Sequence, residues 1–81
     1  MWILYLLECK RGTSTVFYSG ITTDTARRFK QHQTGTGARF TRANPPLRVM
    51  ACREYPNRSE ASRAEAALKK LPSADKPAFF D

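Results

Sequence analysis

The chain has 81 residues, which is enough for one small domain over residues 1–81 and too few for a second. Its hydrophobic fraction of 41% and aromatic fraction of 11% are ordinary for a folded protein, which excludes an extended disordered chain. Fourteen Lys and Arg against seven Asp and Glu give a net charge of +7 and a pI near 10.0, and this balance favours a phosphate backbone as partner over a membrane surface.

The first third of the chain predicts a β-hairpin followed by a helix. Residues 2–10 are rich in large apolar side chains and too few for a convincing isolated helix, which favours a buried strand. A turn at residues 12–14 separates it from β-branched and aromatic residues 15–18, which are typical of a second strand. Residues 22–24 then supply an N-cap for a helix over residues 25–33. We expect its inner face to be shared by Ala26, Phe29 and Gln33.

The middle of the chain predicts a basic loop and a third strand. Residues 34–46 contain two glycines and two prolines together with Arg39 and Arg42, so we expect a loop with one short helical turn around residues 38–41. Strand character resumes over residues 47–55.

The end of the chain predicts a second long helix and a short final one. Asn57 and Glu60 have capping-box spacing, and a helix to about Leu71 would bury a stripe consisting of Ala61, Ala64, Leu68 and Leu71. We expect residues 75–80 to form a final short helix whose aromatic side chains dock on the core. The order strand, strand, helix, strand, helix predicts an α/β (α+β) fold with a small, mostly antiparallel three-stranded sheet flanked by helices.

The cysteines and the N-terminal residues favour a cytoplasmic protein with reduced thiols. Cys9 and Cys52 are isolated in strand-like segments, so we expect reduced, packed thiols and no metal cluster. The apolar run at the N-terminus lacks a basic flank and is interrupted at Glu8. We therefore expect no signal peptide, no membrane span and a cytoplasmic location.

Five polar residues stand at positions that suggest chemistry, namely Tyr5, Tyr18, Arg28, His32 and Glu65. Their order resembles the GIY-YIG nuclease family, in which two tyrosine motifs on a hairpin precede an arginine, often a histidine, and a metal-binding glutamate. The runs YSGITTD at residues 18–24, RRF at residues 27–29 and RAEAALK at residues 63–69 are similar to the short stand-alone bacterial YhbQ-like branch. The two name-giving motifs read LYL and YSG here.

Glu65 is a candidate ligand for the metal ion that phosphodiester hydrolysis would use. Mg²⁺ keeps most of its waters and takes one or two carboxylates plus the substrate phosphate, so a single hard carboxylate suffices for Mg²⁺ or Mn²⁺. The alternative is an ordinary ion pair with Lys69 one turn later, which contributes only about 0.3 to 0.5 kcal/mol. The resemblance favours the ligand over the ion pair.

Arg28 and His32 are four residues apart, so they project from one helix face and can meet one phosphate. Arg27 is the rival of Arg28, and the resemblance favours Arg28, which stands one turn before the histidine. We expect Arg28 to neutralise charge in the transition state. His32 would orient a tyrosine hydroxyl or move a proton, since its ordinary pKa of about 6.5 allows both.

Tyr5 and Tyr18 lie on adjacent predicted strands and could face the same side of the sheet. On composition alone they are ordinary packed tyrosines. The resemblance implies that Tyr5 is the general base and that Tyr18 positions the water or the phosphate. A phenol with a pKa of about 10 needs help from a metal, Arg28 or His32 to act at neutral pH.

These residues predict a metal-dependent endonuclease acting on DNA, or on RNA as the less favoured substrate, with structure-selective or weakly sequence-specific recognition. DNA repair is the expected process, and a protein partner is an expected source of specificity. We expect the strand to be positioned by basic side chains at Arg27, Lys30, Arg39, Arg42, Arg48 and Lys69. One alternative is a non-catalytic nucleic-acid-binding module of the same fold. A weaker one is a protein-interaction adaptor that uses the hairpin and Phe79-Phe80.

Overall fold

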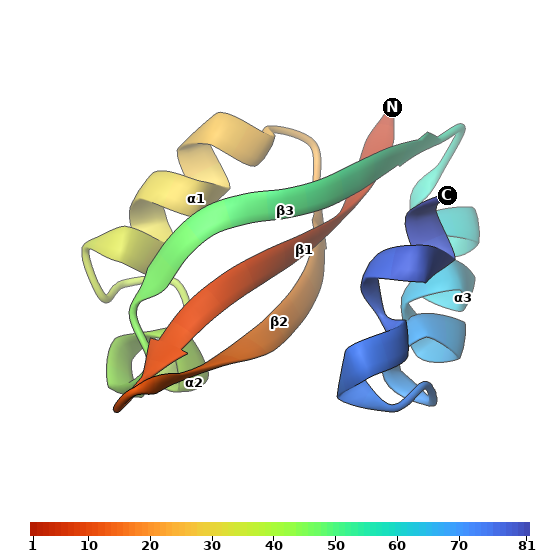
Figure 1. The fold of residues 1–81 in the computed structure, drawn as a ribbon. Helices are drawn as coiled ribbons and strands as arrows, with labels where there is room; N and C mark the ends of the chain where they lie inside the picture. Colours follow the sequence, from red (N-terminus) through yellow and green to blue (C-terminus); the bar gives the residue numbers. More distant parts are fainter.

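The computed structural model describes all of residues 1–81 and forms one three-stranded sheet with helices on both faces (Figure 1). Its elements in chain order are β1 (Trp2–Arg11), β2 (Ser14–Thr22), α1 (Thr25–Gln33), α2 (Arg39–Ala43), β3 (Pro46–Tyr55), α3 (Arg58–Lys69) and two 3-10 turns, η1 (Ser73–Asp75) and η2 (Pro77–Phe80). The strand order is β2-β1-β3, and both pairings are antiparallel. The predicted fold class and element order are confirmed.

The hairpin is closed by a two-residue turn at Gly12 and Thr13, between the paired residues Arg11 and Ser14. Gly12 has a φ of 58°, a left-handed conformation that glycine adopts without steric cost. Both strands of the hairpin extend further than their sequence patterns indicated.

The central strand β1 is buried on both sides, and alternate residues serve different layers. Leu4 and Leu6 pack toward α3 and the C-terminal turns, whereas Tyr5, Leu7 and Cys9 form a second cluster. This second cluster includes Phe29 of α1 and Phe40 of α2. Figure 1 shows the result, with α1 and α2 on one face of the sheet and α3 on the other.

Both longer helices begin as their sequences predict. The Asp24 carboxylate accepts a hydrogen bond from the backbone N–H of Arg27 at 3.1 Å, and the Asn57 side chain accepts from the N–H of Glu60 at 2.9 Å. In α3 the stripe of Ala61, Ala64 and Leu68 faces the sheet. No helix is both long and apolar enough to cross a membrane.

The C-terminal segment consists of the two 3-10 turns rather than one helix, and its aromatic side chains dock as expected. Phe79 and Phe80 pack edge to face with ring centroids 5.6 Å apart, against the cluster of Leu4, Leu6 and Leu68. These rings help to cover the α3 face of the sheet.

Two expectations about burial are wrong. Ala26 and Gln33 are exposed, and the side of α1 that faces the sheet carries Phe29, half-buried Arg28 and fully buried His32. The spacing of apolar residues predicted the wrong inner face of α1, because the inner positions hold polar side chains that have hydrogen-bond partners. Cys9 is buried as expected, but Cys52 of β3 is exposed; both thiols are free.

Candidate active site

The two tyrosines lie on one face of the hairpin, the face covered by α1 and α2. Tyr5 pairs with Gly20 across the strands, and Tyr18 stands opposite Leu7, two residues along in the same alternation. The Tyr5 ring lies over Gly20, where a Cβ would come within 2.6 Å of the Tyr5 Cζ atom. A glycine is therefore required at position 20 so that the Tyr5 hydroxyl can cross the edge strand β2.

His32 joins the tyrosines from α1 and is fully buried. Its Nε2 atom lies 2.9 Å from the Tyr5 hydroxyl, and its Nδ1 atom lies 2.7 Å from the Thr41 hydroxyl of α2. The Tyr18 ring meets the imidazole edge-on at 5.3 Å and stacks on Phe40 at 5.3 Å. The imidazole is therefore held from three sides.

Arg28 stands one turn before His32 on the same helix face. Its guanidinium donates to the Gln31 side chain at 2.9 Å and to the backbone carbonyl of Gly37 at 3.2 Å. Arg28 is half-buried whereas Arg27 is exposed, so Arg28 is the arginine directed toward the tyrosines. Its charge acts on both Tyr5 and His32.

Burial sets the proton affinities of this cluster. Desolvation by burial raises the pKa of Tyr5 above its ordinary value of 10.0, and the charges of Tyr18 and Glu65 raise it further. The hydrogen bond and the positive charge of Arg28 lower this pKa but do not cancel the effect of burial. Desolvation also lowers the pKa of His32 below 6.5, and the charge of Arg28 lowers it further. At neutral pH Tyr5 is therefore protonated and His32 is uncharged.

Glu65 approaches from the other side of the sheet, on α3, which packs on β2 and β1. Its side chain is only 19% exposed, and its Oε2 lies 3.6 Å from the Lys69 ammonium. The negative charge of Glu65 contributes to the raised pKa of Tyr5. No group of three or more His, Cys, Asp or Glu side chains is close enough together to hold a metal ion.

A polar hollow of about 190 Å³ adjoins Arg28 at the start of α1. No hydrophobic residue lines it, and its walls are Thr22, Thr23, Asp24, Arg27, Arg28 and Gln31. Two arginines and two threonines line this space, and the Asp24 carboxylate is occupied in capping the helix. Such a donor set suits a phosphate group.

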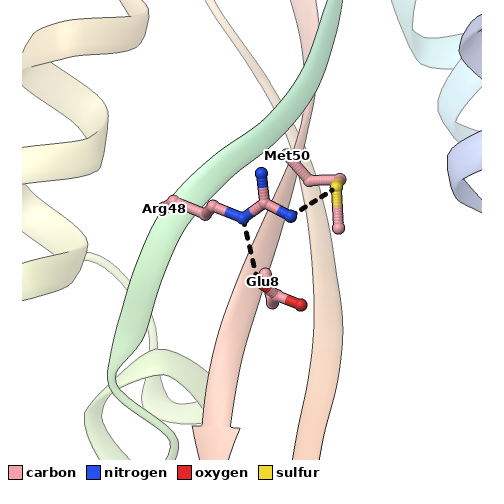
Figure 2. A network of polar contacts seen from close by, with 3 residues as sticks. All are labelled: Glu8, Arg48 and Met50. Atoms are coloured by element: carbon pink, nitrogen blue, oxygen red, sulfur yellow. Dashed lines mark hydrogen bonds and ion pairs between the residues drawn. The ribbon is translucent and has the colours of Figure 1, made fainter.

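The other basic residues expected to bind nucleic acid lie at three places. Arg27 and Lys30 of α1 and Arg39 and Arg42 of α2 are exposed on helices that cover the tyrosine face. Arg48 lies on the opposite face, where it pairs with Glu8 at 2.9 Å and donates to the Met50 sulfur (Figure 2). Lys69 pairs with Glu65, as described above.

Thr41 and Gly37 belong to this arrangement, and the sequence did not indicate either of them. Thr41 is 1% exposed and holds the far nitrogen of His32. A Cβ on Gly37 would come within 2.9 Å of two His32 ring carbons, so the glycine gives the imidazole its space. The glycine-rich pattern of residues 34–46 indicates only a loop at Gly37, and no spacing or composition distinguishes Thr41 from an ordinary helix residue.

The sheet order, the paired tyrosines and the arginine and histidine of α1 define a class of protein. The model of the GIY-YIG catalytic domain matches residues 1–77, and the chain belongs to this family of nuclease domains, whose members generally depend on a divalent metal. The resemblance noted in the sequence is thereby confirmed.

Within that family the chain is similar to proteins named UPF0213. It is 56% identical over 79 residues to one from Xanthomonas axonopodis pv. citri, covering 98% of this chain and 74% of that protein. It is 39% identical over 77 residues to one from Halobacterium salinarum, covering 95% and 96%. The solution NMR structure of the UPF0213 protein BH0048 from Bacillus halodurans matches with a TM-score of 0.54 and 40% identity, covering 98% of this chain and 82% of that one. The UPF0213 name specifies no activity or substrate.

Proposed function

We propose that this domain is a metal-dependent endonuclease that hydrolyses phosphodiester bonds of DNA, or of RNA, with structure-selective or weakly sequence-specific recognition. The observation that carries the proposal is the surroundings of the Tyr5 hydroxyl. It touches the His32 imidazole and interacts with the charges of both Arg28 and Glu65. A purely structural tyrosine needs one hydrogen-bond partner and no such charges.

Tyr5 is the proposed general base, and His32 is the group that makes this role feasible. Its Nε2 takes the Tyr5 proton while the Tyr5 oxygen takes a proton from the attacking water. That water oxygen forms the new bond to phosphorus and the bond to the leaving oxygen breaks. The leaving oxygen then takes a proton from solvent, and the buried His32 returns its proton to the Tyr5 oxygen as the Tyr5 hydroxyl releases its own proton to the solvent in the site. Because the pKa of Tyr5 is raised, the transfer needs an acceptor in contact, and His32 is 2.9 Å away.

Arg28 stabilises the charge that develops on the phosphate oxygens, because its planar guanidinium can donate two parallel hydrogen bonds. Tyr18 fixes the position of the imidazole by ring contact, and its own hydroxyl is available to the water or the phosphate. Arg28 is already held by Gln31 and Gly37, so little side-chain freedom is lost when a phosphate binds.

Glu65 is the residue that would hold Mg²⁺ or Mn²⁺. The Glu65 carboxylate is mostly buried and has one weak ion-pair partner at 3.6 Å. One carboxylate fits a metal ion that takes its other ligands from water and substrate, and it does not fit a metal ion that needs several protein ligands. When bound, the ion supplies positive charge to the phosphate and to the leaving oxygen.

The nucleic-acid backbone is proposed to run from the Arg28 position across the polar hollow at the start of α1. Arg27 on the wall of the hollow would hold a neighbouring phosphate, and the exposed side chains of Lys30, Arg39 and Arg42 would extend the basic track over α1 and α2. Contacts of this kind position a strand without reading its sequence. We leave Arg48 out of the track because its face is opposite.

The test is a cleavage panel of duplex, flap and single-stranded DNA and of RNA, with Mg²⁺ or EDTA. Wild-type protein should cut at least one substrate with Mg²⁺, whereas Tyr5→Phe and Glu65→Ala should bind that substrate and not cut it. Glu60→Ala is the matched control, since Glu60 lies on the same helix and is 46% exposed. A wild type that binds all substrates in EDTA and cuts none would establish the non-catalytic binding module instead.

A further inference from the structure

The contact between Thr41 and His32 determines which ring nitrogen carries the proton. Tyr5, His32 and Thr41 are 2%, 0% and 1% exposed, so their polar atoms depend on one another for partners. The imidazole has one contact at each nitrogen, 2.9 Å to Tyr5 and 2.7 Å to Thr41. A neutral imidazole can donate at only one of them.

The Thr41 hydroxyl settles this choice through its second contact. Its oxygen lies 3.2 Å from the backbone carbonyl of Ala38, a group that can only accept a hydrogen bond. The hydroxyl has one proton to donate. All three contacts are satisfied together only if Thr41 donates to Ala38 and accepts from Nδ1–H of His32. Nε2 then has a free lone pair directed at the Tyr5 hydroxyl.

The opposite tautomer, with the proton on Nε2, would lose the hydrogen bonds that let His32 accept the Tyr5 proton. Nε2–H would donate to the Tyr5 oxygen, and Thr41 would have to turn its proton toward Nδ1 and give up Ala38. In that state His32 cannot accept the Tyr5 proton. The positive charge of Arg28 acts on Tyr5, so the phenol is best matched when its oxygen lone pairs face that charge and its own proton points to His32.

We propose that Thr41 is a positioning residue of the nuclease reaction, which holds His32 as the Nδ1–H tautomer so that Nε2 accepts the proton of Tyr5. This inference rests on the proposed function for its catalytic consequence and stands alone as a statement about the tautomer. The chain of donors runs in one direction, from Tyr5 to His32, from His32 to Thr41, and from Thr41 to the Ala38 carbonyl.

The placement of α2 supports this role. A helix of only five residues gains little stability by itself. It is fastened at its end by Asn44, whose side chain donates to the Phe40 carbonyl at 3.0 Å and accepts from Arg11 of the hairpin at 3.1 Å. These bonds tie α2 to the end of the hairpin and hold Thr41 against His32.

Wild-type protein tests the tautomer without any substitution. His32 is the only histidine in the chain, so long-range ¹⁵N–¹H correlations from its ring require no assignment among histidines. We expect a protonated Nδ1 and an unprotonated Nε2 at pH 7.5. A protonated Nε2 would overturn the proposal whether or not the protein cuts nucleic acid.

Two variants test the consequence for catalysis. Thr41→Val keeps the shape and removes the hydroxyl, and we expect a mixture of tautomers and a fall of about tenfold in kcat, which corresponds to one hydrogen bond, with KM unchanged. Thr41→Ser restores the hydroxyl and should recover the wild-type tautomer and most of the rate. The proposal fails if Thr41→Val retains wild-type kcat, or if Thr41→Ser loses as much rate as Thr41→Val. Absence of cutting by wild type would refute the proposed function and leave the tautomer result standing.

Discussion

Gly20→Ala tests whether the Tyr5 hydroxyl must occupy the space above the edge strand. The added methyl group would lie 2.6 Å from the Tyr5 Cζ, whereas carbon atoms pack at about 3.5 Å, so the ring must move by roughly 1 Å. Tyr5 is 2% exposed and its hydroxyl is bound to His32, so there is little room for the shift. We expect a loss of about 1 to 3 kcal/mol in the free energy of unfolding, as for other overpacked sites.

The effect on the reaction should exceed the effect on stability. A displacement of about 1 Å of a reacting group can reduce a rate about 100-fold. The assay is single-turnover cleavage with Mg²⁺, together with urea denaturation of the same protein.

Gly12→Ala is the matched control for this experiment. Its φ of 58° makes alanine costly there by about 1 to 2 kcal/mol, yet no atom lies within 4 Å of the new methyl group and the turn is at the far end of the hairpin. Gly12→Ala should therefore lose stability and keep its cleavage rate. Wild-type cleavage by folded Gly20→Ala would refute the reasoning about Tyr5.

Two further variants test the phosphate track and the buried imidazole. Arg27→Ala should weaken binding to DNA in EDTA and reduce the slope of log Kd against log salt by about 1. Arg63→Ala removes an equally charged side chain, which is paired with Glu60, and should leave the slope unchanged. Equal slopes for the two variants would contradict the proposed phosphate track. For His32, the folded pKa lies below 6.5, so the unfolded chain binds the extra proton between these two values. The free energy of unfolding should therefore be level above about pH 7 and decrease as the pH falls below 6.5, by at most about 1.4 kcal/mol per pH unit, and His32→Gln should lack that decrease in urea titrations from pH 5 to 7. An identical decrease in the variant would show that other groups are responsible.

The fold was predictable because its local patterns agree with its tertiary structure. The apolar run of β1, the caps at Asp24 and Asn57 and the stripe around Leu68 each determine their element by themselves. What the patterns could not give is the way that α1 faces the sheet. Its inner positions hold Arg28 and His32, and a rule that places apolar residues inside assigns them to the surface.

The candidate site was predictable only in part, for the same physical reason. Tyr5 and Tyr18 share a face because strand alternation and the short turn fix their register. The contact from His32 to Thr41 joins residues nine apart through an irregular loop, and periodicity carries no information across such a segment. The need for glycine at positions 20 and 37 follows only from the positions of the Tyr5 and His32 rings, which the sequence does not give.

In the proposed function, Glu65 is the group that couples metal binding to cleavage at the Tyr5 hydroxyl. The measurement is the rate of Mg²⁺-dependent cutting by wild type, Glu65→Ala and Glu60→Ala on the best substrate of the panel, with binding affinity measured in parallel. We predict that wild type and Glu60→Ala cut, that EDTA stops both, and that Glu65→Ala binds with undiminished affinity and does not cut. Equal cleavage rates for Glu65→Ala and wild type would contradict the role of Glu65 in metal-dependent cleavage.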